Sequence, residues 1–328
     1  MREKGSVFMA SMSVKTDKAP LSERCGKKAR KFRSQIWLQG MVAPGIVWLI
    51  VFCYIPMYGI VIAFNNYQPG QPFFSGPWVG LEHFRVFFHD KYAVQALWNT
   101  LIISALKLLI LFPAPIIFSL LLNEVRCTRY KKFVQSVSYL PFFISWVIMA
   151  GLLKSLLGVN GVINSALTTF GLQSEAIAYL TKPELFRPIA VVSDLWKSVG
   201  WSSILYMAAI SNIPQDMYES AFLDGASRFQ RAMYITLPSI MPTVSIMLIF
   251  NVAGIMGSNF DQHLLLSNPQ NSMVASTLDT YIYGIGLQAG RYSYATAINL
   301  FRSVVSFFLL FTSDRLARLL THGEQGVF

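Results

Sequence analysis

Long apolar segments alternate with short polar ones along the chain, and this pattern is the main structural signal. Each apolar segment reaches the roughly 20 residues that a helix needs to cross the hydrocarbon core of a bilayer. The short, alternating apolar and polar segments that are typical of a transmembrane barrel do not occur in the sequence. The pattern therefore predicts an all-α membrane protein with six transmembrane helices, at about 38–64, 97–122, 134–157, 188–211, 239–260 and 293–313.

The polar segments divide the chain further. We expect a basic N-terminal arm at 1–37, an external loop at 65–96, a core of five spans at 97–313 and a tail at 314–328. Only 13% of the residues are charged, about half the share of a soluble domain, which supports the membrane assignment.

Basic residues predict the orientation. The chain carries 27 Lys and Arg, and most of them lie in the arm, in 123–133, in 212–238 and in the tail. Because loops on the cytoplasmic side are enriched in Lys and Arg, we expect both termini inside. The basic residues behind the net charge of +11 follow this topology pattern, and we expect those of the arm to contact anionic headgroups. This distribution argues against a nucleic-acid partner.

Candidate chemistry is sparse. The three cysteines share no metal-binding spacing, and the four histidines are scattered and form no HExxH pattern. The sequence contains no GxxxxGK[ST] loop, so we expect no nucleotide hydrolysis by this chain. Paired carboxylates or a nucleophile with its base are not evident either, and we expect neither an enzyme nor a metal site.

One charged segment stands out between two apolar spans: ESAFLDGASRFQRAMYITLP, residues 219–238. Asp224–Gly225 is a turn signal, and glycine adopts a positive φ easily. We therefore predict two short helices within 213–238, the second of which continues into the fifth span. A narrow, charged helix on the cytoplasmic side fits a groove on a soluble partner. An amphipathic helix lying on the membrane surface is the alternative.

The spacing of this segment resembles the EAA loop of binding-protein-dependent ABC importer permeases. That pattern has EAA, three residues, Gly, nine residues, Ile, any residue and Leu-Pro, and this chain meets the spacing from Glu219 to Pro238. Two positions depart from the pattern: Ser220 replaces the second EAA residue, and Ala232 stands where family members often carry an aromatic residue.

Further stretches extend the resemblance over about 38–315. DGASRFQ is similar to the carbohydrate-uptake branch, and SYLPFFISW (138–146) and YSYATAINL (292–300) are similar to permeases of oligosaccharide and polysaccharide importers, alginate-type importers among them. The resemblance implies a type I ABC importer permease (MetI-like) fold in the bacterial cytoplasmic membrane.

The resemblance also implies a division of labour. The chain would be non-catalytic and bind no cofactor, with ATP and Mg on two partner ATPase subunits. Its other partners would be a second homologous permease, an extracytoplasmic sugar-binding protein, an oligosaccharide and membrane lipid. The residues carried over to ATPase coupling are Glu219, Ser220, Ala221, Asp224, Gly225, Ala226, Leu237 and Pro238.

Four basic residues fall within the predicted spans, and such residues usually face the interior of a helix bundle or a wet cavity. They are Lys107, Lys154, Lys197 and Arg302. One interpretation is a cationic path for an acidic sugar such as a uronate oligomer. The alternative is that Lys154 reaches toward the headgroups, Asp194 pairs with Lys197 one helical turn away, and the substrate is a neutral oligosaccharide.

Aromatic and amide side chains complete the candidate path. Aromatic rings in the fourth span could stack on sugar rings, although such rings also populate membrane interfaces. Gln262 is a further polar candidate beside the fifth span. A secondary transporter or channel is the alternative from a different class, but the sequence shows neither repeats nor a TVGYG-like filter. The predicted path residues are Asp194, Trp196, Lys197, Trp201, Tyr206, Asn251, Asn259 and Arg302.

Overall fold

A computed structural model describes residues 35–257 and 259–320, with side chains described as far as Arg315. The chain divides into two compact units, Met1–Gly59 and Ile60–Phe328. Most of the predicted basic arm and the end of the predicted tail lie outside the described residues.

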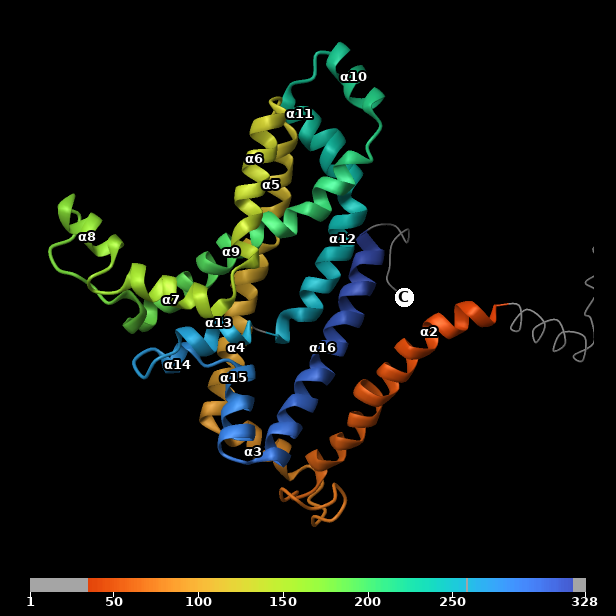
Figure 1. The fold of residues 1–328 in the computed structure, drawn as a ribbon, viewed down its shortest axis with the longest axis vertical. Helices are drawn as coiled ribbons and strands as arrows, with labels where there is room; N and C mark the ends of the chain where they lie inside the picture. The colour runs from red at the N-terminus through yellow and green to blue at the C-terminus, as the bar shows by residue number, and fades with distance from the viewer. Residues whose placement is uncertain (1–34, 258, 321–328) are drawn as a thin grey trace, which may run out of the picture. The chain divides into compact units, whose positions relative to one another are not determined.

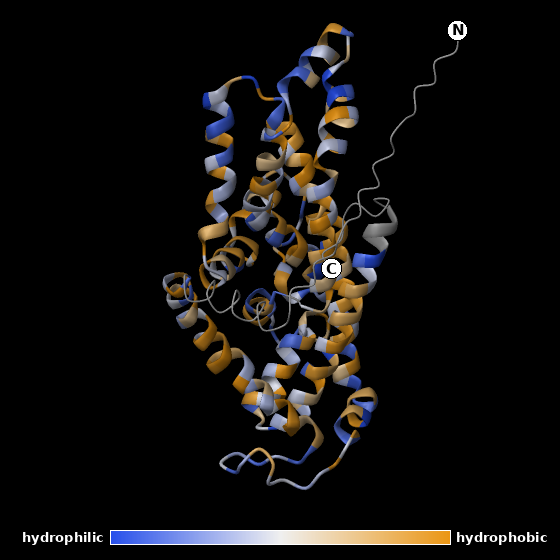
Figure 2. Ribbon diagram, turned by 90° about the vertical axis from the view of Figure 1, so that its right-hand side faces the viewer, coloured by the Kyte–Doolittle hydropathy of each residue, from blue (hydrophilic) through white to orange (hydrophobic). Residues whose placement is uncertain are grey.

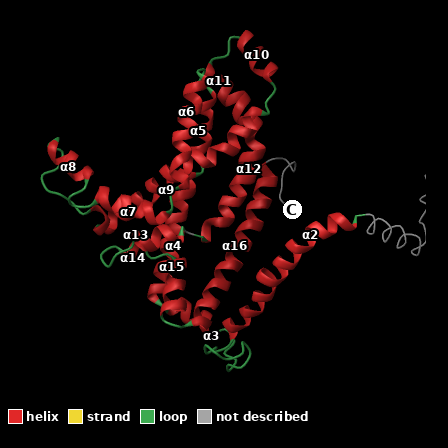
Figure 3. Cartoon of the chain, viewed as in Figure 1, coloured by secondary structure: helices red, strands yellow, loops and turns green. Residues whose placement is uncertain are grey.

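The described residues are predominantly helical (Figure 3). The β-structure within them is one isolated antiparallel bridge between Asn65 and Trp78. The prediction of an all-α fold is therefore confirmed. The α-helices are α2 (Ile36–Leu49), α3 (Glu82–His89), α4 (Lys91–Leu111), α5 (Pro113–Asn123), α6 (Thr128–Tyr139), α7 (Trp146–Leu157), α8 (Val162–Thr169), α9 (Pro183–Ser211), α10 (Gln215–Leu223), α11 (Arg228–Arg231), α12 (Leu237–Ala253), α13 (Phe260–Leu266), α14 (Ser272–Ala275), α15 (Leu278–Tyr283) and α16 (Tyr292–Leu320).

Five helical stretches in the described part of the chain are long and apolar enough to cross a membrane. The predicted span at 188–211 is not among them, although it forms a single helix of 29 residues, α9. The charges of Asp194 and Lys197 lie in the middle of that helix. The count of six spans and the inward orientation of the termini stay predictions. The five stretches are Ile36–Phe64, Lys91–Asn123, Trp146–Thr169, Arg228–Met256 and Tyr292–Arg315.

The third predicted span is not one helix. Residues 134–157 are divided between α6 and α7, with a 3₁₀ turn at Leu140–Phe143 and an extended Ile144 between them. Pro141 has no N–H to continue an α-helix, and the Ser145 hydroxyl accepts the N–H of Ile148 to start α7. In Figure 1, α7 runs across the direction of α6.

The second span begins within the segment predicted as an external loop. Asp90 caps the first turn of α4 by accepting hydrogen bonds from the N–H groups of Tyr92 and Ala93. The remaining loop is not structureless, because it contains α3, whose Phe87 is buried.

Three helices of the Ile60–Phe328 unit form the core next to the charged segment. Side chains from α5, α9 and α12 make one buried cluster, and α16 lies beside α12 (Figure 1). Figure 2 shows hydrophobic residues dominating the middle of the bundle, with polar residues more frequent toward the end that carries α10. The buried members of the cluster are Ile116, Tyr206, Ile210, Ile240 and Val244.

Candidate translocation cavity and coupling segment

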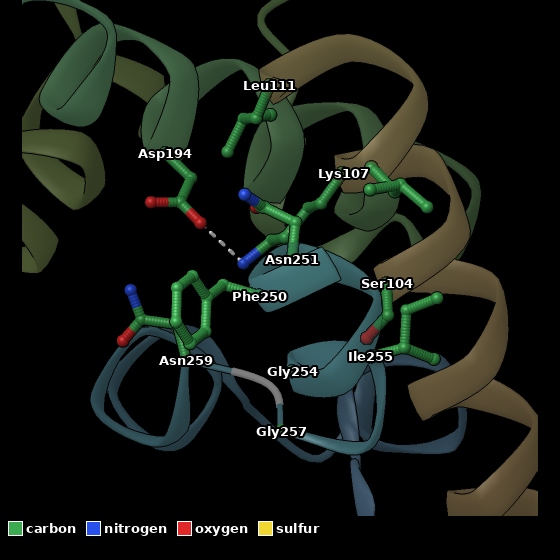
Figure 4. A pocket seen from close by; sticks show the side chains of 11 residues that line it. Ser104, Lys107, Leu111, Asp194, Phe250, Asn251, Gly254, Ile255, Gly257 and Asn259 are labelled. Carbon is green, nitrogen blue, oxygen red and sulfur yellow. Dashed lines mark ion pairs between the residues drawn. The ribbon is translucent and has the colours of Figure 1, made fainter. Parts of the chain in front are cut away.

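A cavity of about 340 Å³ opens between α4, α9 and the end of α12 (Figure 4). Its wall combines apolar side chains with a few polar groups, which suits a flexible polar ligand. From α4, the residues 104, 107, 108 and 111 recur at helical spacing and so share one face. The lining residues are Ser104, Lys107, Leu108, Leu111, Asp194, Phe250, Asn251, Gly254, Ile255, Gly257 and Asn259.

An ion pair lies in the wall of this cavity. Lys107 Nζ is 2.6 Å from Asp194 Oδ2, and the two side chains are only 13% and 14% exposed. Lys107 also donates to Oε1 of Gln262 at 2.8 Å, and Gln262 Nε2 donates to the carbonyl of Ala190 and the hydroxyl of Ser193. Three helices, α4, α9 and α13, are thus joined by one polar network.

The predicted pairing of Asp194 with Lys197 is therefore wrong. Lys197 is 9% exposed, and its ammonium donates to the carbonyls of Pro141, Phe142 and Ile144. These carbonyls lie at the break between α6 and α7, where the helical hydrogen-bond ladder is interrupted. Lys197 caps this break and does not line the cavity.

The aromatic residues of α9 were predicted to stack on sugar rings in the path, and the structure places them elsewhere. Trp201 stacks on the ring of Phe142 with centroids 4.4 Å apart. Trp196 lines an apolar groove together with Leu153 and other aliphatic side chains. Tyr206 is 4% exposed and packs in the α5–α9–α12 core. None of the three lines the cavity.

The remaining basic residues give no strongly cationic wall. Arg302 pairs with Asp279 and lies beside Gly257, at the edge of the cavity. Lys154 lies in the last turn of α7 and does not line it. Of the four basic residues within the predicted spans, Lys107 alone lines the cavity, and Asp194 neutralises it.

The amide candidates are better placed. Asn251 and Asn259 both line the cavity (Figure 4). Gln262 contacts the lysine of the cavity, Lys107. Sequence reasoning named Lys107 as a basic residue of a possible cationic path but left it out of the predicted path residues. Ser104 was missed, although its spacing from Lys107 on α4 contains the signal. The structure gathers no group of three or more metal-binding side chains within its described residues.

The charged segment folds as predicted, as two short helices with a turn. Gly225 has φ of 81°, which a residue with a Cβ adopts only at a cost. Ser227 and Gln230 form a reciprocal capping box that starts α11. A π-helical turn at Ala232–Thr236 then leads into α12, so the chain is helical from Arg228 to Ala253.

The surface of α10 is apolar at its tip. Phe222 is 65% exposed and Leu223 is 85% exposed, while Glu219 and Asp224 are exposed beside them. Exposed apolar side chains flanked by acids are typical of a docking site on a protein partner. The Tyr218 hydroxyl lies 2.9 Å from the Thr236 hydroxyl and ties α10 to the helical run that follows. We name residues 213–238 the coupling segment.

Both helices that flank the coupling segment reach the cavity. Asp194 lies on α9, which ends at Ser211, and Asn251 lies on α12. At 1.5 Å per residue, the helical run from Arg228 to Asn251 spans about 35 Å. A displacement of the coupling segment can therefore reach two walls of the cavity.

Comparison with known proteins identifies the family. Residues 113–322 match the model described as "Binding-protein-dependent transport system inner membrane component". The chain belongs to this permease family. It is a multi-pass inner-membrane protein of the ABC transporter class, with the MetI-like fold expected from the sequence, which argues against a secondary transporter or channel.

Three similar proteins cover nearly the whole permease. The polygalacturonan/rhamnogalacturonan transport system permease protein YteP of Bacillus subtilis (strain 168) is 41% identical over 299 residues, 91% of this chain and 92% of YteP. A crystal structure of a bacterial ABC transporter involved in the import of the acidic polysaccharide alginate matches with a TM-score of 0.83 and 39% identity, over 90% of this chain and 99% of that chain. A crystal structure of a bacterial alginate ABC transporter in complex with an alginate pentasaccharide-bound periplasmic protein matches with a TM-score of 0.83 and 38% identity, over 91% and 99%.

Proposed function

We propose that this permease is a transmembrane subunit of an ATP-driven, binding-protein-dependent importer of acidic oligosaccharides. The observation that carries the proposal is the similarity, over about nine-tenths of the chain, to permeases of alginate and polygalacturonan transport. Both of those polysaccharides are uronate polymers, so the shared feature of the substrates is a carboxylate on the sugar ring.

The cavity supplies one half of the translocation path in this proposal. Lys107, Asp194, Asn251 and Asn259 offer hydrogen bonds of both polarities to sugar hydroxyls, and Lys107 offers a counter-ion to a uronate carboxylate. A second homologous permease would supply the other half of the path.

The coupling segment connects the path to ATP hydrolysis. Two partner ATPase subunits bind ATP and Mg, and one of them takes α10 into a surface cleft through the exposed tip at Phe222 and Leu223. The buried cluster of α5, α9 and α12 makes the attached helices move together. Closure of the ATPase dimer would then shift Asp194 relative to Asn251 and change the access to the cavity.

The remaining partners follow from the same class. An extracytoplasmic sugar-binding protein would deliver the oligosaccharide on the side opposite the coupling segment. The permease itself has a mechanical and path-forming role, without catalysis or a bound cofactor.

The test is ATPase stimulation in proteoliposomes that contain this permease, its genetically linked partner permease, the ATPase and the binding protein. We expect uronate oligomers to stimulate ATP hydrolysis, and neutral oligosaccharides of equal length to stimulate it far less. ATPase activity that responds to neutral sugars alone would refute the acidic substrate. It would still support an ATP-driven importer of oligosaccharides.

A neutral oligosaccharide is the second candidate, and the Lys107–Asp194 pair favours it. A lysine neutralised by an aspartate 2.6 Å away presents little net charge to the path. A paired lysine and aspartate still bind hydroxyl groups well, so this candidate keeps the same cavity and changes only the substrate.

A further inference from the structure

A second cavity, of about 360 Å³, lies at the base of the coupling segment. It is bounded by the end of α5, the loop that follows, and the helices α10 and α11. Arg126 comes from the loop, and Arg228 and Arg231 come from α11. We name this the arginine cavity. It is separate from the translocation cavity and shares no lining residue with it.

Among the described residues, no carboxylate forms an ion pair with any of the three guanidinium groups. The ion pairs Lys107–Asp194 and Arg302–Asp279 lie elsewhere. Nε of Arg231 is buried and has no hydrogen-bond partner among the described residues, although its guanidinium lies 5.9 Å from the ring centre of Phe222.

One acid, Glu124, also lines the arginine cavity, so the wall has an excess of positive charge. A buried donor without a partner costs free energy unless a ligand or water satisfies it. The arginine cavity is therefore incomplete as it stands and suits an anion.

The position of the arginine cavity at the ends of two candidate spans indicates the kind of anion. The apolar stretch Lys91–Asn123 ends at a lining residue, and the stretch Arg228–Met256 begins at one. Two candidate spans thus have an end at this cavity, and the ends of spans lie toward the lipid headgroups. Basic cavities between transmembrane helices on the cytoplasmic side bind anionic headgroups.

We propose that the arginine cavity binds the phosphate group of an anionic phospholipid headgroup. Planar guanidinium groups match phosphate oxygens with paired hydrogen bonds. The inference rests on the proposed cytoplasmic position of the coupling segment, but not on the identity of the transported sugar.

The arginine cavity also touches the coupling machinery. Tyr218 lines it and bonds to Thr236, so a bound headgroup contacts α10 and α11 at once. An anionic headgroup would hold the two helices together in the arrangement that docks on the ATPase. We therefore expect the transport cycle to require anionic lipid on this side.

The experiment uses the complete importer in phosphatidylcholine nanodiscs with and without phosphatidylglycerol. Native mass spectrometry measures the retained lipid, and ATP hydrolysis with binding protein and substrate measures coupling. The test variant is Arg126→Gln with Arg228→Gln. The matched control is Arg129→Gln, an exposed arginine on the same side that does not line the arginine cavity.

We expect each arginine removed to weaken phosphatidylglycerol retention about fivefold. The control variant should retain the lipid like the unmodified protein. Phosphatidylglycerol should raise coupled ATP hydrolysis in the unmodified protein and not in the double variant. Equal lipid retention by the double variant and the control would overturn the proposal.

Two further arms identify the source of the anion. Glycerol 1-phosphate binding to the importer in pure phosphatidylcholine, if lost in the double variant, supports the phosphate site and assigns it to a soluble ligand. Loss of the ATPase subunits from the purified double variant, with unchanged lipid retention, would overturn the proposal and assign the arginines to the ATPase interface. Failure of every sugar to stimulate ATP hydrolysis leaves the lipid measurement intact, so the two proposals are tested separately.

Discussion

Lys107 on α4 and Asp194 on α9 form an ion pair of 2.6 Å in the wall of the translocation cavity. The pair joins two helices that lie side by side, one of which leads to the coupling segment. Breaking one partner of a shielded pair leaves an uncompensated charge, whereas removing both partners can be nearly neutral. The pair therefore allows a direct test of how charge in the cavity affects transport.

Lys107→Gln should lower uptake of uronate oligomers, because it removes the counter-ion and leaves the Asp194 carboxylate facing the substrate. We expect a loss of about tenfold or more in transport efficiency, with a smaller loss for neutral oligosaccharides. The measurement is uptake of labelled oligomers into proteoliposomes.

Two further variants complete that prediction. Asp194→Asn removes the carboxylate that neutralises Lys107 and should favour uronates over neutral sugars. This effect is opposite to the one expected for Lys107→Gln. Lys154→Gln is the control, since Lys154 does not line the cavity. Equal effects of Lys107→Gln on acidic and neutral substrates would show that the pair is only structural.

Gly225 separates α10 from α11 with a positive φ, and a Cβ at this position would meet no atom within 4 Å. Substitutions should therefore act through the backbone alone. Gly225→Val should cost about 1–2 kcal/mol in the turn and uncouple ATP hydrolysis from uptake, while Gly225→Asn should be milder. Gly225→Pro should uncouple more strongly, because proline fixes φ near −65°.

The ratio of sugar transported to ATP hydrolysed measures this effect. Glu219→Lys, which reverses an exposed charge on α10, should lower the same ratio without loss of membrane insertion. Unchanged ratios for Gly225→Val and Glu219→Lys would remove the coupling role from this segment.

The helical class and the two-helix coupling segment could be predicted because their signals are local. Span length depends on a run of apolar residues, and the break at Asp224–Gly225 depends on two adjacent residues. The break between α6 and α7 was also encoded locally, in Pro141 and Ser145. The apolar pattern concealed it, since hydrophobicity continues through the break.

The cavity could be predicted only in part, because it depends on which helices are neighbours. A spacing of three residues made Lys197 a reasonable partner for Asp194. The contact between α9 and α4 instead places Lys107 there, and nothing in the sequence pattern of α9 reports that neighbour. Tyr206 shows the same limit, since a tyrosine in a span can face a path or a core with equal local sequence.

Gly200 lies at a close approach of α9 to α6. A Cβ at this position would lie 2.1 Å from the carbonyl oxygen of Ser138, so Gly200→Ala must push the two helices apart. We expect a loss of about 1–3 kcal/mol in stability, measured as a lower melting temperature of the purified complex. The control is Gly151→Ala on α7, where a Cβ meets nothing within 4 Å. Equal melting temperatures for the two variants would contradict the close packing.

Asp90 joins the start of α4 to α15 and to the first turn of α16. Its carboxylate accepts hydrogen bonds from the hydroxyls of Tyr281, at 2.5 Å, and Tyr294, at 3.2 Å, besides capping α4. Burial alone would raise the pKa of Asp90, but the hydrogen bonds from Tyr281, from the backbone of Ala93 and Tyr92, and from Tyr294 together hold that pKa below its usual value.

Because the pKa of Asp90 is lowered in the folded state, the Asp90 carboxylate stabilises the fold at a pH above the usual aspartate pKa of about 3.9. This contribution is lost as the pH falls through the pKa that Asp90 has in the folded state. Asp90→Asn keeps a helix cap but removes the charge, so it should lower stability at pH 7 by about 1–2 kcal/mol. The difference from the unmodified protein should shrink below about pH 4.

Tyr281→Phe removes the shortest hydrogen bond to the carboxylate, raises the pKa of Asp90 and should move the acid-induced loss of stability to higher pH. Melting curves from pH 7 to pH 3 in nanodiscs measure both effects, and a constant difference between Asp90→Asn and the unmodified protein across that range would show that the charge of Asp90 does not stabilise the fold.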